Sequence, residues 1–370
     1  MITGIGYGRV RNLQHHVNYF EDLEKEYSFF IESQKNHVID NREYGWLPAG
    51  NWNETKEIIE KKNITAVLLS IEGAHVFNSG LVEFGKKASE SEIIENIKKV
   101  KQWKFPPVFI TFAHNFNNEL CGHANSLEPI KAFVDQSTGI NTGFTPLGKT
   151  VLHHLLSDQN GRPVFIDIKH MSLKARKEYF EIIETDYRRQ RIPTLVSHGA
   201  VNGMQWNGLK TADLPDVFYP SDINFFDEEI AAIGKGGGLF AIQFDTRRIA
   251  QKNLVKKRLN SLFGKSDVKR SALLIWYQIV HITRILDKAG IFGWGTAAIG
   301  SDYDSTIDPL PGIWSAEQFP LLENELFRLA SDYLNGNPPL KVMENKMITA
   351  GEVVNRFFID NTIRFLKENC

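Results

Sequence analysis

The feature that most constrains the fold of this chain is a series of six short apolar runs, rich in β-branched residues, that each end in an acid or a histidine. Such runs are typical of strands buried on both faces, as in a parallel sheet covered by helices. The sequence therefore predicts parallel strands with reactive side chains at their ends. The six runs span residues 64–72, 107–114, 163–170, 193–198, 238–245 and 297–304.

The segments between these runs have apolar residues at helical spacing, so strand and helix alternate as in an α/β fold. Functional groups at the carboxyl ends of parallel strands match the (β/α)8 TIM barrel, whose active sites lie on that face. An open doubly wound sheet also binds ligands there, but no glycine-rich fingerprint follows a strand, which favours the barrel. Helices are expected over 91–103, 145–157, 172–189, 226–234 and 273–288.

Composition limits the classes of partner. The chain has 43 Lys and Arg against 44 Asp and Glu, a formal charge of -1, so it has no long-range field to gather nucleic acid or an anionic membrane. The longest apolar run, 272–280, is too short to span a bilayer, and no signal peptide is visible at the start. We expect a small-molecule substrate, no nucleic acid and no transmembrane segment, and the compartment is left open.

Candidate chemistry lies at the strand ends, where His114, His170, His198, Glu72 and Asp302 stand. Imidazole and carboxylate are zinc ligands, and zinc with an open position acidifies water and polarises a carbonyl. One such histidine is as readily a hydrogen-bonded core residue, but three at strand ends favour a metal site for the hydrolysis of an amide or ester.

Other reactive groups are less informative. There is no Gly-x-Ser-x-Gly elbow, and Cys121 lies in an expected loop with no assignable base, so covalent catalysis is disfavoured. His75 and His123 follow strand ends closely enough to line a pocket, whereas His153 and His154 fall within an expected helix. The metal hypothesis therefore remains the leading one.

Several blocks occur in the same order as in the membrane (renal) dipeptidase family, a group of zinc peptidases, and the resemblance covers roughly residues 64 to 360. Each block alone is a weak motif, but their shared order is specific. The blocks are IEGAHVF around Glu72, TFAHNFNNELCGHANSL around His114, GFTPLGKTVLHHLL leading to PVFIDIKHMS at His170, LVSHGAV around His198, NFFDEEIAAIGKGGGLFAIQF, IGSDYD around Asp302, and GEVVNRFF.

The resemblance implies an amidohydrolase-like (β/α)8 barrel with two zinc ions that hydrolyses dipeptides. Glu72 matches the carboxylate that bridges the metals, and His170 and His198 match the histidines of the second metal. His114 matches the histidine that contacts substrate and the tetrahedral intermediate. Asp302 matches the acid beside the first metal, a candidate proton acceptor from the attacking water that also contacts substrate.

The sequence departs from the family at its front. The family's His-x-Asp or His-x-His pair on the first strand occurs nowhere in the chain, and six strands are evident where a closed barrel needs eight. We therefore expect a chain that lacks the family's N-terminal segment, an incomplete barrel and one or two zinc ions. An open sheet edge would favour self-association, including a homodimer.

The same observations predict the domain organisation. Residues 1–63 are expected to form a helical or irregular segment, with helical patterns at 12–32 and 53–62, and residues 64–370 a catalytic TIM-barrel domain that ends in helices. An insertion at about 200–222 lacks the arginine with which the family grips the dipeptide carboxylate, and Lys210 is its only cation. Hydrolysis is therefore more firmly predicted than dipeptide specificity.

Three functional hypotheses follow. The first is a zinc-dependent dipeptidase-like hydrolase that cleaves a peptide bond with metal-activated water. The second is a catalytically inactive or truncated barrel with a binding role, which the absent His-x-Asp pair supports. The third is a related barrel hydrolase that acts on a lactone or cyclic amide, since the same metal arrangement would serve.

Overall fold

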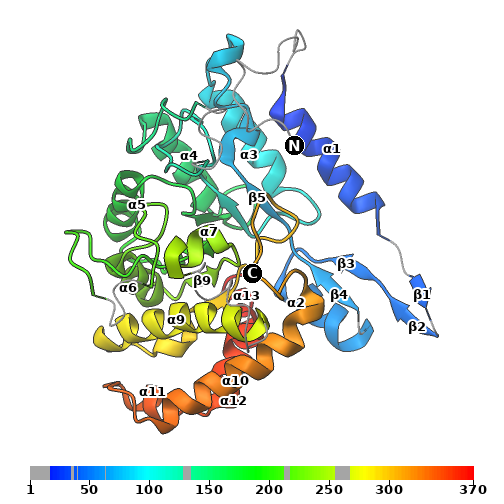
Figure 1. Cartoon of the computed structure of the whole chain (residues 1–370). Coiled ribbons are helices and arrows are strands. Elements are labelled where there is room, and N and C mark those ends of the chain that lie inside the picture. Colours follow the sequence, from blue (N-terminus) through cyan, green and yellow to red (C-terminus); the bar gives the residue numbers. More distant parts are fainter. Residues whose placement is uncertain are drawn as a thin grey trace. The chain divides into compact units, whose positions relative to one another are not determined.

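The computed structural model describes residues 17–34, 37–39, 41–62, 64–127, 135–211, 217–254 and 267–370. The chain divides into two compact units, one of residues 1–188 with 366–370 and one of residues 189–365. Strands and helices alternate along each (Figure 1), so the predicted α/β fold with parallel strands is confirmed. The domain boundary predicted at residues 63–64 stays a prediction.

The first unit carries three parallel strands, β5 (Ser70–Glu72), β6 (Phe109–Thr111) and β7 (Phe165–Asp167), with β6 in the middle. Their central residues Ile71, Ile110 and Ile166 are buried, as near-continuous apolar strands require. The helices of this unit are α1 (Tyr19–Glu32), α2 (Trp52–Glu57), α3 (Glu90–Lys101), α4 (Pro146–Leu156) and α5 (Leu173–Asp186).

The segment before Ile64 contains strands that the sequence did not reveal. β3 (Trp46–Pro48) pairs in parallel with β4 (Thr65–Val67), the first half of the apolar run that continues into β5. β1 (His37–Ile39) and β2 (Arg42–Tyr44) form a small antiparallel hairpin. The assignment of residues 1–63 as a separate segment stays a prediction, and the sequence did not reveal these strands because runs of three residues are too short to show a period.

The second unit repeats the pattern with β8 (Leu195–Gly199), β9 (Leu239–Ile242) and β10 (Ala297–Ile299), parallel and with β9 in the middle. All six apolar runs therefore contain strands, as predicted. The helices after β8 along the chain are α6 (Asp227–Lys235), α7 (Thr246–Ile249), α9 (Asp267–Lys288), α10 (Phe319–Asn335), α11 (Met343–Met347), α12 (Ala350–Asn355) and α13 (Asn361–Asn369), and the last of them ends within the 366–370 segment of the first unit.

Helix α9 is the longest of the described helices, and more than half of its residues are buried. Its apolar face is buried along its whole length, and α6 and α10 both pack against it. Across the described ranges, no helix has both the length and the apolar character that crossing a membrane would require.

Candidate metal centre

The parallel register of the first unit brings the side chains of Glu72, His114 and His170 to one edge of its strands. Glu72, Thr111 and Asp167 are aligned as the last residues of β5, β6 and β7. His114 and His170 each lie three residues beyond the end of their strands. Because the carboxyl ends of parallel strands share an edge, the chain places Glu72 and both histidines together.

The three residues form a compact donor group. The Nε2 atoms of His114 and of His170 each lie 3.4 Å from Oε1 of Glu72. One ligand atom from each residue lies within 4.8 Å of the others, which is the arrangement that a bound metal ion needs. The family resemblance matches His114 to the histidine that contacts substrate, and this assignment stays a prediction; in the structure its Nε2 is one of the three donor atoms of this group.

Buried polar contacts fix the strand ends beneath the group. The Thr111 hydroxyl donates to Oδ2 of Asp167 at 2.6 Å, and the Lys169 amide donates to Oδ1 of Asp167 at 3.0 Å. His170 itself adopts φ +65°, a left-handed conformation that is uncommon for residues other than glycine. Its carbonyl accepts from the Ala124 amide at 2.8 Å, so the surrounding loop holds this turn.

Electrostatics favour neutral imidazole at this centre. Burial lowers the pKa of His170 to about 3, against the opposing effect of its hydrogen bond with Glu72. Neutral imidazole is the form that binds metals, so the protonation state of His170 at neutral pH suits a ligand. The Glu72 side chain is 41% exposed and that of His114 is 22% exposed, so the donor group is open to a small molecule.

His75 lies against this group, which agrees with its expected place near a pocket. Its ring stacks on that of His114 with centroids 6.2 Å apart and meets Phe116 edge-on at 4.8 Å. Burial, followed by the charge of His114, lowers the pKa of His75 to about 3. Its Nδ1 is buried without a hydrogen-bond partner among the described residues.

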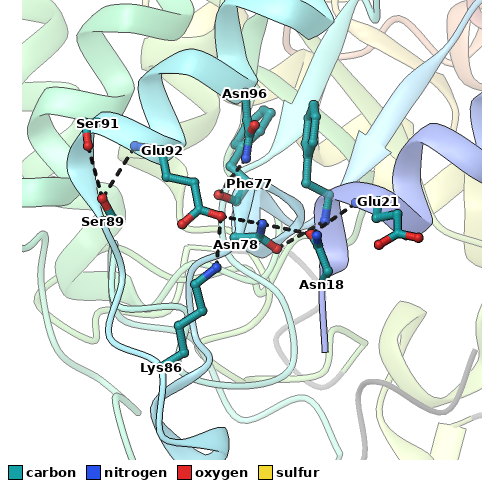
Figure 2. A network of polar contacts seen from close by, with 10 residues as sticks. Asn18, Glu21, Phe77, Asn78, Lys86, Ser89, Ser91, Glu92 and Asn96 are labelled. Atoms are coloured by element: carbon teal, nitrogen blue, oxygen red, sulfur yellow. Dashed lines mark hydrogen bonds and ion pairs between the residues drawn. The ribbon is translucent and has the colours of Figure 1, made fainter. Parts of the chain in front are cut away.

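A polar network holds the short 3-10 helix that carries His75 (residues Ala74–Phe77), as Figure 2 shows. Asn78 follows that helix, and its Nδ2 donates to Asn18 at 2.9 Å and to Glu92 at 2.8 Å. Lys86 pairs with the same Glu92 oxygen at 2.8 Å. Because Asn18 caps α1 and Glu92 lies in the first turn of α3, two helix starts fix the segment after β5.

The second unit holds the other two predicted site residues. His198 is buried within β8, and its Nδ1 lies 2.8 Å from the Ser197 hydroxyl. Asp302 stands three residues beyond β10 at φ +62°. Gln243, directly after β9, donates from Nε2 to Oδ2 of Asp302 at 2.8 Å. Sequence reasoning missed Gln243, because a glutamine at a strand end gives no signal by itself.

Other histidines have structural surroundings. The ring nitrogens of the fully buried His123 lie 3.1 and 3.0 Å from the carbonyls of Ala124 and Thr138. His153 contacts the Tyr187 hydroxyl at 2.9 Å on the surface of α4. Burial raises the pKa of the Cys121 thiol well above its ordinary value, which disfavours the thiolate that a nucleophile would need.

Residues 47–345 match the family described as membrane dipeptidase, peptidase family M19. The chain belongs to the membrane dipeptidase family. The match begins within β3, the strand that the sequence did not reveal, and continues past β10. The predicted family is therefore confirmed. No curated protein matches the chain.

Solved structures with 12–15% identity share the fold of this chain. An amidohydrolase from Pseudomonas aeruginosa matches with a TM-score of 0.51 and 15% identity over 87% of this chain and 78% of its own. The probable dipeptidase PvdM from Pseudomonas aeruginosa matches with a TM-score of 0.51 and 14% identity over 94% and 76%. A metallo peptidase from Rhodobacter sphaeroides, liganded with a phosphinate mimic of the dipeptide L-Ala-D-Ala, matches with a TM-score of 0.52 and 12% identity over 88% and 69%.

Membrane dipeptidases are metal-dependent hydrolases of amidohydrolase-like barrel fold, and zinc is their typical metal. Among the described residues of this family member, Glu72, His114 and His170 form the group that could hold an ion. The donor set fits zinc, because it combines one carboxylate with two imidazoles. The family and the geometry therefore point to the same edge of the first unit.

Proposed function

We propose that this member of the membrane dipeptidase family is a zinc-dependent peptidase that hydrolyses the amide bond of dipeptides or closely related small amides. The observation that carries the proposal is the donor group of Glu72, His114 and His170 at the ends of three parallel strands. A dipeptidase-like substrate follows from the family match and stays part of the proposal.

Each residue of the donor group has a defined part in this proposal. Glu72 supplies the negative charge, and both imidazoles face its Oε1 at 3.4 Å. His170 is buried and neutral and acts as a fixed ligand. His114 is more accessible, and we assign it the contact with substrate together with a share of the metal. Zinc, when bound, supplies the Lewis acidity that polarises a carbonyl and acidifies water.

His198 and Asp302 complete the proposal from the sequence resemblance. We assign His198 as a further metal ligand and Asp302 as the acid that contacts substrate and accepts a proton from water. Gln243 holds the Asp302 carboxylate through its 2.8 Å hydrogen bond, so the acceptor oxygen is oriented before substrate arrives. Self-association, including a homodimer, stays a prediction from the sequence.

Metal content measured together with hydrolysis of a dipeptide panel tests this function. We expect the purified chain to hold at least one zinc ion and to hydrolyse dipeptides. Glu72→Gln should lose both metal and turnover, because the amide removes the charge that draws the ion. His198→Ala should lower turnover by a factor of about a hundred or more, on the scale of a lost catalytic metal interaction.

His153→Ala is the matched control, because His153 lies on α4 and contacts Tyr187 instead of the donor group. It should retain metal and activity. Metal bound by the parent chain without hydrolysis of any dipeptide would contradict the enzyme and support a barrel with a binding role. No metal in the parent chain would contradict the donor group itself.

A further inference from the structure

The loops that follow β9 and β10 in the second unit are joined by several contacts. The Thr246 amide donates to the Asp308 carbonyl at 2.8 Å, and the Thr246 hydroxyl donates to Oδ2 of Asp308 at 2.5 Å. Asp245 and Pro309 form an antiparallel bridge at the same place. The glutamine directly after β9 donates to Asp302 in the loop after β10. The two loops are therefore held together as one wall that includes Asp302.

Arg247, the second residue of α7, belongs to this wall, and Asp245 fixes its side chain. Nε donates to Oδ1 of Asp245 at 2.9 Å, and Nη2 donates to Oδ2 at 2.6 Å. Nη2 also donates at 2.6 Å to the carbonyl of Thr306, which lies in the loop after β10. The Asp245 side chain is only 2% exposed, so the acid that orients the guanidinium is buried. Arg247 is thus held in one orientation before a ligand arrives.

One edge of this guanidinium is left for a ligand. An arginine has five N–H donors, and the contacts with Asp245 and Thr306 use those of Nε and Nη2. Within the described ranges of the chain, Nη1 of Arg247 has no hydrogen-bond partner, so its two N–H groups remain. The Arg247 side chain is 32% exposed, which leaves this edge accessible. Guanidinium N–H groups suit the oxygens of a carboxylate.

The acids around Arg247 keep it charged and limit the kind of ligand. The hydrogen bond with Asp245, together with the charges of Asp245, Asp308 and Asp302, raises the pKa of Arg247 against the opposing effect of burial. A simple anion would be repelled by these three acids as well as attracted by Arg247. The wall therefore favours a ligand that carries a positive group beside its carboxylate. A dipeptide with free ends is such a zwitterion.

We propose that Arg247 binds the free carboxylate of the substrate through Nη1, so that this wall selects dipeptides with an unmodified carboxyl end. The inference rests on the proposed function, in which Asp302 contacts substrate, because Arg247 and Asp302 belong to the same joined pair of loops. Asp245 is a positioning residue that holds the guanidinium. Arg247 determines specificity and takes no part in proton transfer.

Isothermal titration of the full chain as purified tests this subsite with two dipeptide analogues. In the first, a methylene-amine linkage that cannot be hydrolysed replaces the peptide bond, and in the second the carboxylate of that compound is also converted to an amide. We expect the parent chain to bind the acid about tenfold or more tightly than the amide, as for a lost charged hydrogen bond. Arg247→Gln should remove this preference and leave the affinity for the amide unchanged.

A second variant separates the loss of the ligand contact from a loss of folding. Arg247→Gln leaves the buried Asp245 without its partner, which destabilises a folded chain. The double variant Asp245→Asn/Arg247→Gln removes both charges together, and it should show the same loss of preference for the acid. The melting temperature of each variant shows that it is folded.

Arg328→Gln is the matched control, because Arg328 is an exposed arginine of α10 that pairs with Glu325 and Asp332. It should keep the full preference for the acid. Equal affinity of the parent chain for acid and amide, or an unchanged preference in both Arg247 variants, would overturn the subsite and leave the proposed function in place. Failure of both analogues to bind would also overturn the subsite, and the proposed function with it only if the chain also hydrolysed no dipeptide.

Discussion

At the scale of the residue, the conformation of Gly73 sets the direction of the backbone directly after Glu72. Its φ of +112° lies where residues with a side chain are strained, and a Cβ there would stand 2.4 Å from the His75 ring. A side chain at this position would push His75 off His114. The backbone conformation after β5 and the packing beside the donor group therefore depend on the absence of a Cβ atom at Gly73.

Gly73→Ala should destabilise the chain by about 2–4 kcal/mol, from backbone strain together with the clash, and should lower metal content. Gly85→Ala is the matched control, because Gly85 also has a positive φ, +78°, but a Cβ there would meet nothing within 4 Å. Gly85→Ala should lower the free energy of unfolding by only about 1 kcal/mol and leave the metal content unchanged. Urea unfolding and elemental analysis measure both effects, and similar losses in the two variants would contradict the role of His75 packing.

At the scale of the element, the end of α9 is tied to the segment that leads into α11 by one carboxylate. Asp287 is buried and accepts from the amides of Lys341 and Val342 at 2.7 and 2.9 Å and from Asn345 Nδ2 at 2.8 Å. Burial opposes its ionisation, but these hydrogen bonds outweigh burial and leave the pKa of Asp287 below its ordinary value. The charged form therefore stabilises the folded state.

Asp287→Asn should lower the free energy of unfolding by about 1–3 kcal/mol at pH 7, because an amide cannot accept as many hydrogen bonds as the carboxylate. The stability that the charge contributes is complete above the unfolded pKa of about 3.9 and is lost as the pH falls through the lower folded pKa. The difference in the free energy of unfolding between the parent chain and the variant should therefore become smaller below about pH 4. Denaturant titrations of both proteins at pH 7 and pH 3 measure this difference in the free energy of unfolding. The same difference at both pH values would show that the charge of Asp287 is not its cause.

At the scale of the whole molecule, metal binding and folding should be linked. A ligand that binds only the folded state stabilises it by about 2.7 kcal/mol at a hundred times its Kd. We expect a chelator to lower the melting temperature of the parent chain by a few degrees and to leave Glu72→Gln unchanged. Calorimetric scans with and without chelator measure this, and an equal shift in both proteins would mean that the donor group does not hold the ion.

The strands, the candidate site residues and the family could be predicted from the local sequence. Apolar runs with β-branched residues gave all six predicted strands, because burial on both faces leaves a continuous pattern that short-range reading detects. Glu72, His114 and His170 could be singled out as candidates for the same reason, since each stands at the end of such a run. The family was also readable, because its blocks keep their order along the chain.

Tertiary structure decided what no single segment encodes. β3 is three residues long, and only its pairing with β4 makes it a strand. The His281–Asp227 pair joins α9 to the start of α6, and the hydrogen bond from Gln243 to Asp302 joins the ends of β9 and β10. In each case the partners are far apart in sequence, and their contact exists because neighbouring elements pack at a fixed register.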